Sequence, residues 1–351
     1  MLRILLSFYV LLLITYSFCA HGEPKAPCYF IFGDSLCDAG NNNELNTLAK
    51  ANYAPYGVDF PGGLATGRFT NGFTIFDVIT RLLGIQDLIS PFSTAFGTEM
   101  LKGVNYASGS AGIQSISGSH LGDRIWLAKQ VQNHGVTVGE LQSFINGSVS
   151  SYLNKCLYTV NIGSDDYINN YFKPKYYPTK DDFNPEQFAT SLINDYEQQL
   201  KVLYSYGARK TAIFGLGLLG CIPEELQINN ATLCIKEVNQ AVHIFNKKLV
   251  TLVDSLYATL PGAKFTFIDI AAMETVSPLS LGFVTDATCC KLRGDYQCEP
   301  STPPCLDRNF HAYMDGFHPT EFLNVVTAKT AFNSPLSLFV HPVDINNLVT
   351  S

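Results

Sequence analysis

A serine near the amino terminus and an Asp-His pair near the carboxyl terminus are the residues of this sequence best suited to chemistry. Ser35 follows an apolar run at residues 29–32 through a Gly-Asp turn, which places its hydroxyl at the end of a predicted buried strand. Asp315 and His318 are three residues apart, a spacing that can bring a carboxylate and an imidazole to one side of a turn. A serine nucleophile, a histidine base and an aspartate that orients it are the parts of a nucleophilic hydrolase. Without Ser35, the Asp-His pair would more simply be a helix cap beside a surface histidine.

The elements that must position these residues alternate between strands and helices. Apolar, β-prone runs lie at residues 28–32, 104–106, 155–162, 210–214 and 264–268. Helical spacing of apolar side chains covers residues 73–83 and 235–256, and a further helix at 196–206 ends at Gly207. This alternation predicts βαβ units and a mainly parallel sheet covered on both faces. Because ligands bind at the carboxyl ends of such strands, Ser35, Ser110 and Asp165 are expected at one edge of the sheet.

Composition narrows the class of protein without choosing a substrate. The 351 residues are 46% apolar and 15% charged, which suits a compact globular enzyme rather than a disordered or fibrous chain. A formal charge of −7 argues against nucleic acid or an anionic membrane surface as the main partner. No composition shift or internal repeat marks a boundary, so we predict one domain over residues 23–351. The oligomeric state stays open.

Residues 1–22 are predicted to be a secretory signal peptide. Arg3 gives a basic start, residues 4–15 form a short apolar core, and the small residues Ala20 and Gly22 follow at cleavage-site spacing. Removal is expected near residues 19–23; an uncleaved anchor is the alternative. No later stretch is long and apolar enough to span a bilayer, and the carboxyl terminus carries no retention signal. We therefore expect a secreted, extracellular protein without integral membrane association.

The cysteines and two sequons fit secretion. Without Cys19, nine cysteines remain, and in an oxidising compartment they indicate disulfides, with Cys37 the candidate for the unpaired thiol. Four of them crowd one Gly/Pro-rich loop: Cys289, Cys290, Cys298 and Cys305. Zinc is the rival interpretation, but the adjacent Cys289 and Cys290 are not a C-x-x-C pair and no histidine lies at finger spacing. Asn146 and Asn230 open N-x-[ST] sequons and are predicted glycosylation sites.

The turn at residues 33–35, continued by Asp38, Gly40, Asn41 and Asn42, resembles the first conserved block of the GDSL esterase/lipase family within the SGNH hydrolases. Three later segments resemble the family's further conserved blocks in the right order, at residues 103–108, 161–167 and 315–318. A fourth segment, at residues 219–223, matches one that is typical of the plant members. The resemblance covers essentially the whole mature chain. It implies an α/β fold, a flavodoxin-like three-layer αβα sandwich with a mainly parallel five-stranded sheet.

The resemblance also implies roles for single residues. Ser35 would be the nucleophile of a carboxylic ester hydrolase that acts through an acyl-Ser35 intermediate, with His318 as general base and Asp315 orienting it. Backbone N–H groups of Ser35 and of the second block would bind the oxyanion. The second-block position is Ser110, or Gly109 just before it. A serine can supply this N–H if the turn needs no positive φ.

The third block departs from the family pattern Gly-x-Asn-Asp. It is Gly163-Ser164-Asp165-Asp166 here, so Asp165 stands where an asparagine side chain would donate to the oxyanion. An ionised carboxylate has no proton to donate and repels the developing charge. A protonated Asp165, its pKa raised by burial or by Asp166, would restore a donor. Otherwise Asp165 only caps the following turn and the backbone donors suffice.

Two other functions stay open at this point. The change at Asp165 also fits a catalytically weak or inactive binding or accessory protein of the same fold, and the fold also permits an acyltransferase in which an alcohol replaces water. For a hydrolase, small-molecule or polymeric esters are equally compatible, including acyl lipids, cutin-like polyesters and acetylated polysaccharides.

Cofactor and metal chemistry are not predicted. The glycine pattern at residues 215–220 would need a helix to open there to bind a dinucleotide, but Cys221-Ile222-Pro223 follows and the next predicted helix starts near Cys234. A Cys221–Cys234 disulfide is expected to close this loop instead. No two histidines are spaced i, i+4, and the Gly-x-Ser-x-Gly elbow of α/β-hydrolases does not occur.

Overall fold

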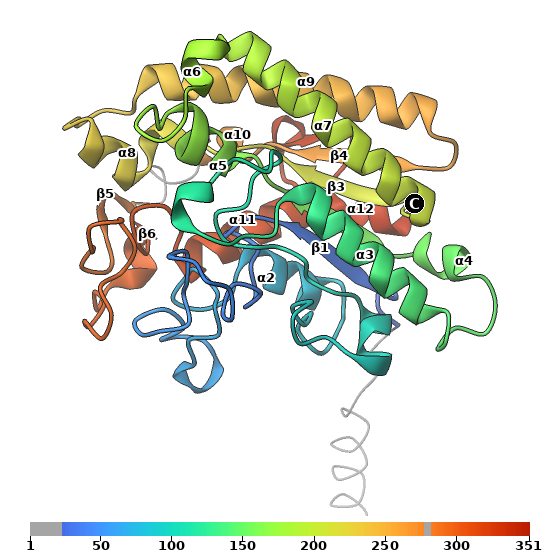
Figure 1. The fold of residues 1–351 in the computed structure, drawn as a ribbon. Helices are drawn as coiled ribbons and strands as arrows, with labels where there is room; N and C mark the ends of the chain where they lie inside the picture. Colours follow the sequence, from blue (N-terminus) through green and yellow to red (C-terminus); the bar gives the residue numbers. More distant parts are fainter. Residues whose placement is uncertain (1–22, 277–281) are drawn as a thin grey trace, which may run out of the picture.

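A five-stranded sheet runs through the centre of the molecule (Figure 1). The computed structural model describes residues 23–276 and 282–351, so the predicted signal peptide lies outside the described residues. The strands, in spatial order, are β1 (Tyr29–Gly33), β2 (Leu157–Asn161), β3 (Lys210–Phe214), β4 (Lys264–Ile268) and β7 (Val340–His341). The first four are parallel, and β7 pairs with β4 in the antiparallel sense. This arrangement confirms the predicted α/β fold with a mainly parallel five-stranded sheet.

The fifth predicted strand was wrong. Residues 104–106 form isolated bridges, in which Asn105 pairs with Ile31 and with Pro91, rather than a strand of the sheet. Three residues supply only two hydrogen bonds to β1, from Ile31 N to the Val104 carbonyl and from Tyr106 N to the Ile31 carbonyl. The fifth member is β7 at the opposite edge, which is two residues long and too short to show an alternating pattern in the sequence.

Helices cover both faces of the sheet (Figure 1). On one face lie α3 (Leu127–Leu141), α7 (Pro185–Tyr206) and α9 (Lys236–Thr259), and on the other lie α2 (Ile75–Leu82), α11 (Glu321–Phe332) and α12 (Ile345–Thr350). Side chains of a strand alternate between the two layers, since Phe30 and Phe32 pack with the first set and Tyr29 and Ile31 with the second. The two apolar cores therefore make the sheet the middle of three layers.

Shorter elements complete the chain. They are α4 (Val149–Leu153), α5 (Ser164–Asp166), α6 (Thr179–Asp182), α8 (Pro223–Ile228), α10 (Ile270–Val276) and the parallel strands β5 (Val284–Thr288) and β6 (His311–Tyr313). None of the helices in the described part of the chain has the length and apolar character needed to cross a membrane.

Local sequence explains where the long helices begin and end. Asn184 caps α7, Pro185 occupies its first turn, and Gly207 ends it with a φ of 121°, a conformation that favours glycine. Pro319 lies just before the last long helix but outside it, since Thr320 is the N-cap and α11 begins at Glu321. Pro319 instead forms a bridge with Tyr313, and its carbonyl accepts from the Thr70 hydroxyl at 2.9 Å.

Within residues 23–276 and 282–351, four disulfides and one buried free thiol agree with the cysteine analysis. The pairs are Cys28–Cys156, Cys221–Cys234, Cys289–Cys305 and Cys290–Cys298, and the free cysteine is Cys37. The predicted Cys221–Cys234 pair closes the loop between β3 and α9. The last two pairs cross-link residues 289–305, a segment that contributes to the wall of the cavity beside Ser35.

A buried ion pair fixes the start of α2 against the loops that follow β1. Arg68 donates to both carboxylate oxygens of Asp77 at 2.8 Å, and both side chains are almost fully buried. Asp77 also accepts from the Thr74 backbone N–H in a capping box. Removing one partner of such a pair leaves an uncompensated buried charge.

Arg68→Met is therefore expected to lower the free energy of unfolding by about 3–5 kcal/mol. Chemical denaturation measures this change. The control is Lys102→Met, which breaks the exposed Lys102–Asp87 pair and should cost no more than about 1 kcal/mol. Equal losses in the two variants would contradict the structural role given to the buried pair.

Candidate active site

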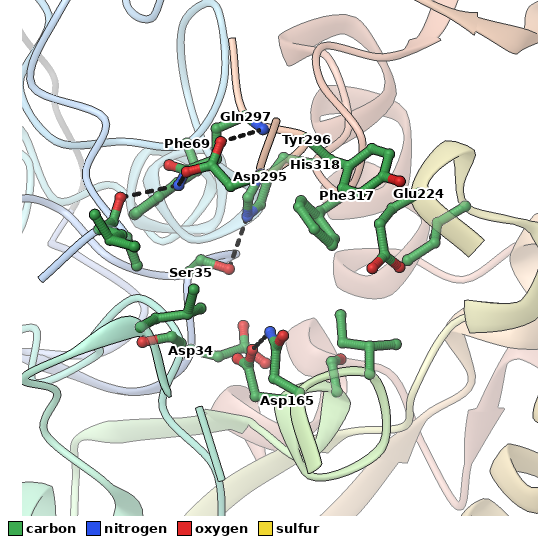
Figure 2. A pocket seen from close by; sticks show the side chains of 18 of the residues that line it. Asp34, Ser35, Phe69, Asp165, Glu224, Asp295, Tyr296, Gln297, Phe317 and His318 are labelled. Atoms are coloured by element: carbon green, nitrogen blue, oxygen red, sulfur yellow. Dashed lines mark hydrogen bonds between the residues drawn. The ribbon is translucent and has the colours of Figure 1, made fainter. Parts of the chain in front are cut away.

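The three residues singled out in the sequence meet at the carboxyl end of β1, where Figure 2 shows Ser35 and His318. His318 Nε2 lies 2.8 Å from Ser35 Oγ. On the other side of the imidazole, His318 Nδ1 lies 2.9 and 2.8 Å from the two carboxylate oxygens of Asp315. Asp315 is completely buried and His318 is 5% exposed. A hydroxyl, an imidazole and a carboxylate are thus hydrogen-bonded in series, although 283 residues separate Ser35 from His318.

The turn after β1 explains how Ser35 is presented. Asp34 N donates to the Asn161 carbonyl at 3.2 Å, and Asp34 accepts from Leu36 N at 3.0 Å, which fixes the residues on both sides of Ser35. Gly33 is required here, because a Cβ atom would lie 2.4 Å from Cys37 Sγ and 2.5 Å from the Asn161 carbonyl oxygen. Within the described residues, the backbone N–H of Ser35 donates to no protein acceptor.

The turn that carries Asp315 and His318 is held by hydrogen bonds between its own residues. Asp315 Oδ1 accepts from the backbone N–H groups of Phe317 at 2.9 Å and His318 at 2.8 Å. The ring of Phe69 packs on the imidazole with 4.8 Å between ring centroids. These contacts leave the imidazole little freedom to rotate away from Ser35.

The second block places Ser110, rather than Gly109, at the cavity. Gly109 N is already used, since it donates to Asp38 Oδ2 at 3.0 Å. Ser110 lines the same cavity as Ser35, and its N–H donates to no protein acceptor in the described chain. The condition stated for this position, a turn without a positive φ, is not met, because Ser110 has a φ of 60°. A serine holds here a conformation that glycine adopts more easily.

The third block places Asp165 beside the same cavity, and it is 4% exposed. Burial raises the pKa of Asp165 to about 6, while the hydrogen bond from Asn169 and the charges of His318 and Arg124 act in the opposite direction. The expected contribution of Asp166 to the pKa of Asp165 is not found among these causes. Asp166 instead accepts from Ile113 N at 2.7 Å and from Ser117 Oγ at 2.6 Å.

The partner of Asp165 determines which oxygen can carry a proton. Asn169 Nδ2 donates to Asp165 Oδ1 at 2.6 Å, so Oδ1 is an acceptor (Figure 2). Oδ2 is then the oxygen left to hold the proton when the carboxyl is neutral. Asp34, whose Oδ2 is buried and has no partner in the described chain, has its pKa raised by burial and by the charge of Asp165.

A cavity of about 300 Å³ opens above Ser35 and Asp165. Its wall combines apolar and polar side chains, including Leu36, Phe69, Ile168, Leu219, Phe317, Lys173, Glu224, Asp295, Tyr296 and Gln297. Figure 2 shows Asp295 and Gln297 on one side of Ser35, Asp165 on the other, and Phe317 and Glu224 farther along the cavity. Lys173 and Glu224 form an ion pair in this wall.

Sequence reasoning missed several residues of this site. Tyr56 Oη lies 2.5 Å from Asp315 Oδ2, yet 259 residues separate the two and no local pattern marks the tyrosine. The loop that supplies Asp295 and Gln297 was recognised only for its cysteines. Asn169 was within reach of the sequence analysis, because residues four apart in helical segments lie close together, and it belongs to the helical segment Tyr167–Tyr171 that directly follows α5.

The glycine pattern at residues 215–220 follows β3. A short turn of helix at Leu219–Cys221 overlaps its end, and then comes α8, which the sequence analysis did not predict. Leu218 N donates to the carboxylate of Glu274 at 2.5 Å, and Glu274 also lies against Gly217. The Glu274 carboxylate therefore binds the backbone of this glycine segment.

One group of potential metal ligands lies in the described chain outside the cavity, formed by Cys305, Asp307 and His311. Cys305 is bonded to Cys289, so its sulfur is not a thiolate ligand. The remaining carboxylate and imidazole face each other at 3.4 Å.

Comparison with known proteins agrees with this geometry. The family described as GDSL-like Lipase/Acylhydrolase matches residues 29–329. Three GDSL esterase/lipases of Arabidopsis thaliana are 47, 44 and 43% identical to the chain; the alignments cover 94, 99 and 98% of this chain and 94, 98 and 97% of the relatives. Several disulfides and relatives of this kind fit an extracellular protein. The resemblance inferred from the sequence blocks is confirmed, and the chain belongs to the GDSL-like lipase/acylhydrolase family of serine ester hydrolases.

Proposed function

We propose that residues 23–351 form a single secreted domain that hydrolyses carboxylic esters through an acyl-Ser35 intermediate. The observation that carries this proposal is the series of hydrogen bonds from Ser35 Oγ to His318 Nε2 and from His318 Nδ1 to Asp315. Its geometry fits general-base activation of a hydroxyl. Ester chemistry is the activity of the family to which the chain belongs.

In the first half-reaction, Ser35 Oγ attacks the ester carbonyl carbon while His318 Nε2 takes the hydroxyl proton. The buried Asp315 carboxylate stabilises the imidazolium that forms and keeps Nδ1 as the protonated nitrogen. The tetrahedral intermediate then collapses, the carbon–oxygen bond to the alcohol breaks, and His318 returns the proton to the leaving alkoxide. In the second half-reaction, water attacks the acyl-serine with His318 again as base, and the acid product leaves.

The negative oxygen of each tetrahedral intermediate needs donors already in place. The unused N–H groups of Ser35 and Ser110 are two candidates on one cavity wall. Asp165 is a third donor only when its Oδ2 carries a proton. Ester turnover should therefore depend on whether Asp165 is protonated, whereas the amide of an asparagine at this position would carry its donor hydrogens at every pH.

Secretion to the apoplast or cell wall is part of this proposal. Asn146 and Asn230 are both exposed, as glycosylation at their sequons requires. Enzymatic removal of N-glycans from the protein secreted by a plant host should lower its mass. Asn146→Gln and Asn230→Gln should each lower it by one glycan. An unchanged mass in both variants would contradict the proposed modification.

Hydrolysis is tested with short p-nitrophenyl esters followed by product analysis with and without added alcohols. Release of the free acid in both conditions supports hydrolysis. Formation of a new ester in preference to the acid would favour the acyltransferase alternative. The matched relatives do not favour the catalytically weak binding protein, although Asp165 is the observation from which that alternative arose.

A further inference from the structure

We infer that Tyr56 is a positioning residue that holds the catalytic aspartate, Asp315, to the disulfide-bonded wall of the substrate cavity. This inference rests on the proposed ester hydrolysis. Tyr56 itself is absent from the cavity lining, so it would act through Asp315 rather than touch a substrate.

The hydrogen bonds of Tyr56 fix the direction of donation. Cys298 N lies 3.1 Å from Tyr56 Oη, and a backbone N–H can only donate. The tyrosine hydroxyl therefore accepts from Cys298 and donates its own proton to Asp315 Oδ2 at 2.5 Å. Burial and the charge of Asp315 raise the pKa of Tyr56 well above its ordinary value, so the hydroxyl keeps the proton that it donates.

Tyr56 is the hydrogen-bond donor to Asp315 that lies far from it in the sequence. In the described chain, the other donors to this carboxylate are the backbone N–H groups of Phe317 and His318 and the His318 ring. All of them lie within three residues and move with the same turn. Asp315 Oδ2 is thus held against the rest of the protein by the Tyr56 hydroxyl.

The tyrosine is itself fixed by a rigid cluster. It is 1% exposed and packs with Ala49, Phe69, Met314 and both members of the Cys290–Cys298 disulfide. The same disulfide closes the loop whose Asp295, Tyr296 and Gln297 face the cavity (Figure 2). The loop that shapes the cavity wall therefore also anchors the carboxylate that orients His318.

Two effects are expected when the Tyr56 hydroxyl is removed. The carboxylate gains freedom to turn, so His318 is held less well toward Ser35 and the chemical step slows. In addition, the charge of Asp315 is no longer shared with a phenol and attracts the imidazolium more strongly.

Tyr56→Phe tests this inference with a short p-nitrophenyl ester as the probe. We expect kcat to fall about 10- to 100-fold, the range for losing a hydrogen bond to a charged group, with KM nearly unchanged. We also expect the acid limb of the kcat/KM profile to move to higher pH. Thermal unfolding of each variant allows activity to be expressed per folded molecule.

Tyr53→Phe is a matched control. Tyr53 packs edge-on against Tyr56 with 5.3 Å between ring centroids, and its hydroxyl also bonds to Cys298, but at the carbonyl oxygen at 3.0 Å. In the described chain, no hydrogen bond joins the Tyr53 hydroxyl to Asp315. This variant should keep kcat and the acid limb of the parent. Equal losses in both variants, or a Tyr56→Phe enzyme with parental kcat and pH profile, would overturn the inference. An inactive parent would instead overturn the proposed function, so the two failures are distinguishable.

Discussion

Asp165→Asn should raise ester turnover by about 10²–10³-fold at pH 8, the usual worth of one side-chain donor to an oxyanion. At that pH, the parent Asp165 is ionised, because burial raises its pKa only to about 6. An ionised carboxylate offers no proton and opposes the charge that forms on the substrate oxygen. In the variant, the amide oxygen can keep the bond from Asn169 at the Oδ1 position, which leaves its NH₂ group at the position of Oδ2.

The pH dependence of turnover should differ between the parent and Asp165→Asn. Above a pH of about 6, the parent loses the proton of Asp165 and its turnover should fall, whereas at low pH turnover falls because a general base must be unprotonated to accept the serine proton. The parent should thus be active in a narrow acidic range, and the variant should extend that range toward alkaline pH. Asp181→Asn, at an exposed position, is the control and should match the parent. If Asp165→Asn were no faster than the parent at any pH, the proposed effect of Asp165 on the oxyanion would be contradicted.

Stability should respond to the same ionisation. The pKa of Asp165 rises from 3.8 to about 6 on folding, so its stabilising contribution is complete below about pH 4 and is lost as pH rises through about 6. The loss corresponds to about 3 kcal/mol. Asp165→Asn does not ionise and should therefore gain stability over the parent at pH 8 but not at pH 4.

Ser35→Ala and His318→Ala should each lower kcat by about 10⁴–10⁶-fold, as expected when a nucleophile or its base is removed from a hydrogen-bonded series. The double variant should be little worse than either single one, because the two residues act as a unit. Both single variants should unfold at nearly the parental temperature. Ser115→Ala, at an exposed serine, is the control and should keep parental activity. Additive losses in the double variant would contradict a shared catalytic step.

The sequence predicted the framework well, for identifiable reasons. The four parallel strands are five-residue apolar runs separated by amphipathic helices, and both features are local. β7 could not be found, because two residues carry no pattern. Residues 104–106 were wrongly predicted to be a strand, because β propensity does not reveal how many backbone hydrogen bonds a segment will form with its neighbours.

The candidate site was predictable where chemistry and local spacing coincide. Ser35, Asp315 and His318 were identified from residue type, turn chemistry and family blocks, and the structure places them within hydrogen-bonding distance. Tyr56 could not be found, because its contact with Asp315 exists only after folding brings distant loops together. The positive φ of Ser110 could not be predicted either, because glycine is the residue that usually indicates this conformation in a sequence and a serine does not.

Active-site labelling with a fluorophosphonate tests the central claim most directly. The reagent forms a covalent bond only with a serine whose hydroxyl is activated as a nucleophile. We predict that the parent enzyme is labelled on the peptide that contains Ser35, that Asp165→Asn is labelled faster at pH 8, and that Ser35→Ala is not labelled. A folded parent protein that remains unlabelled, or that is labelled on a different serine, would contradict the assignment of Ser35 as the nucleophile.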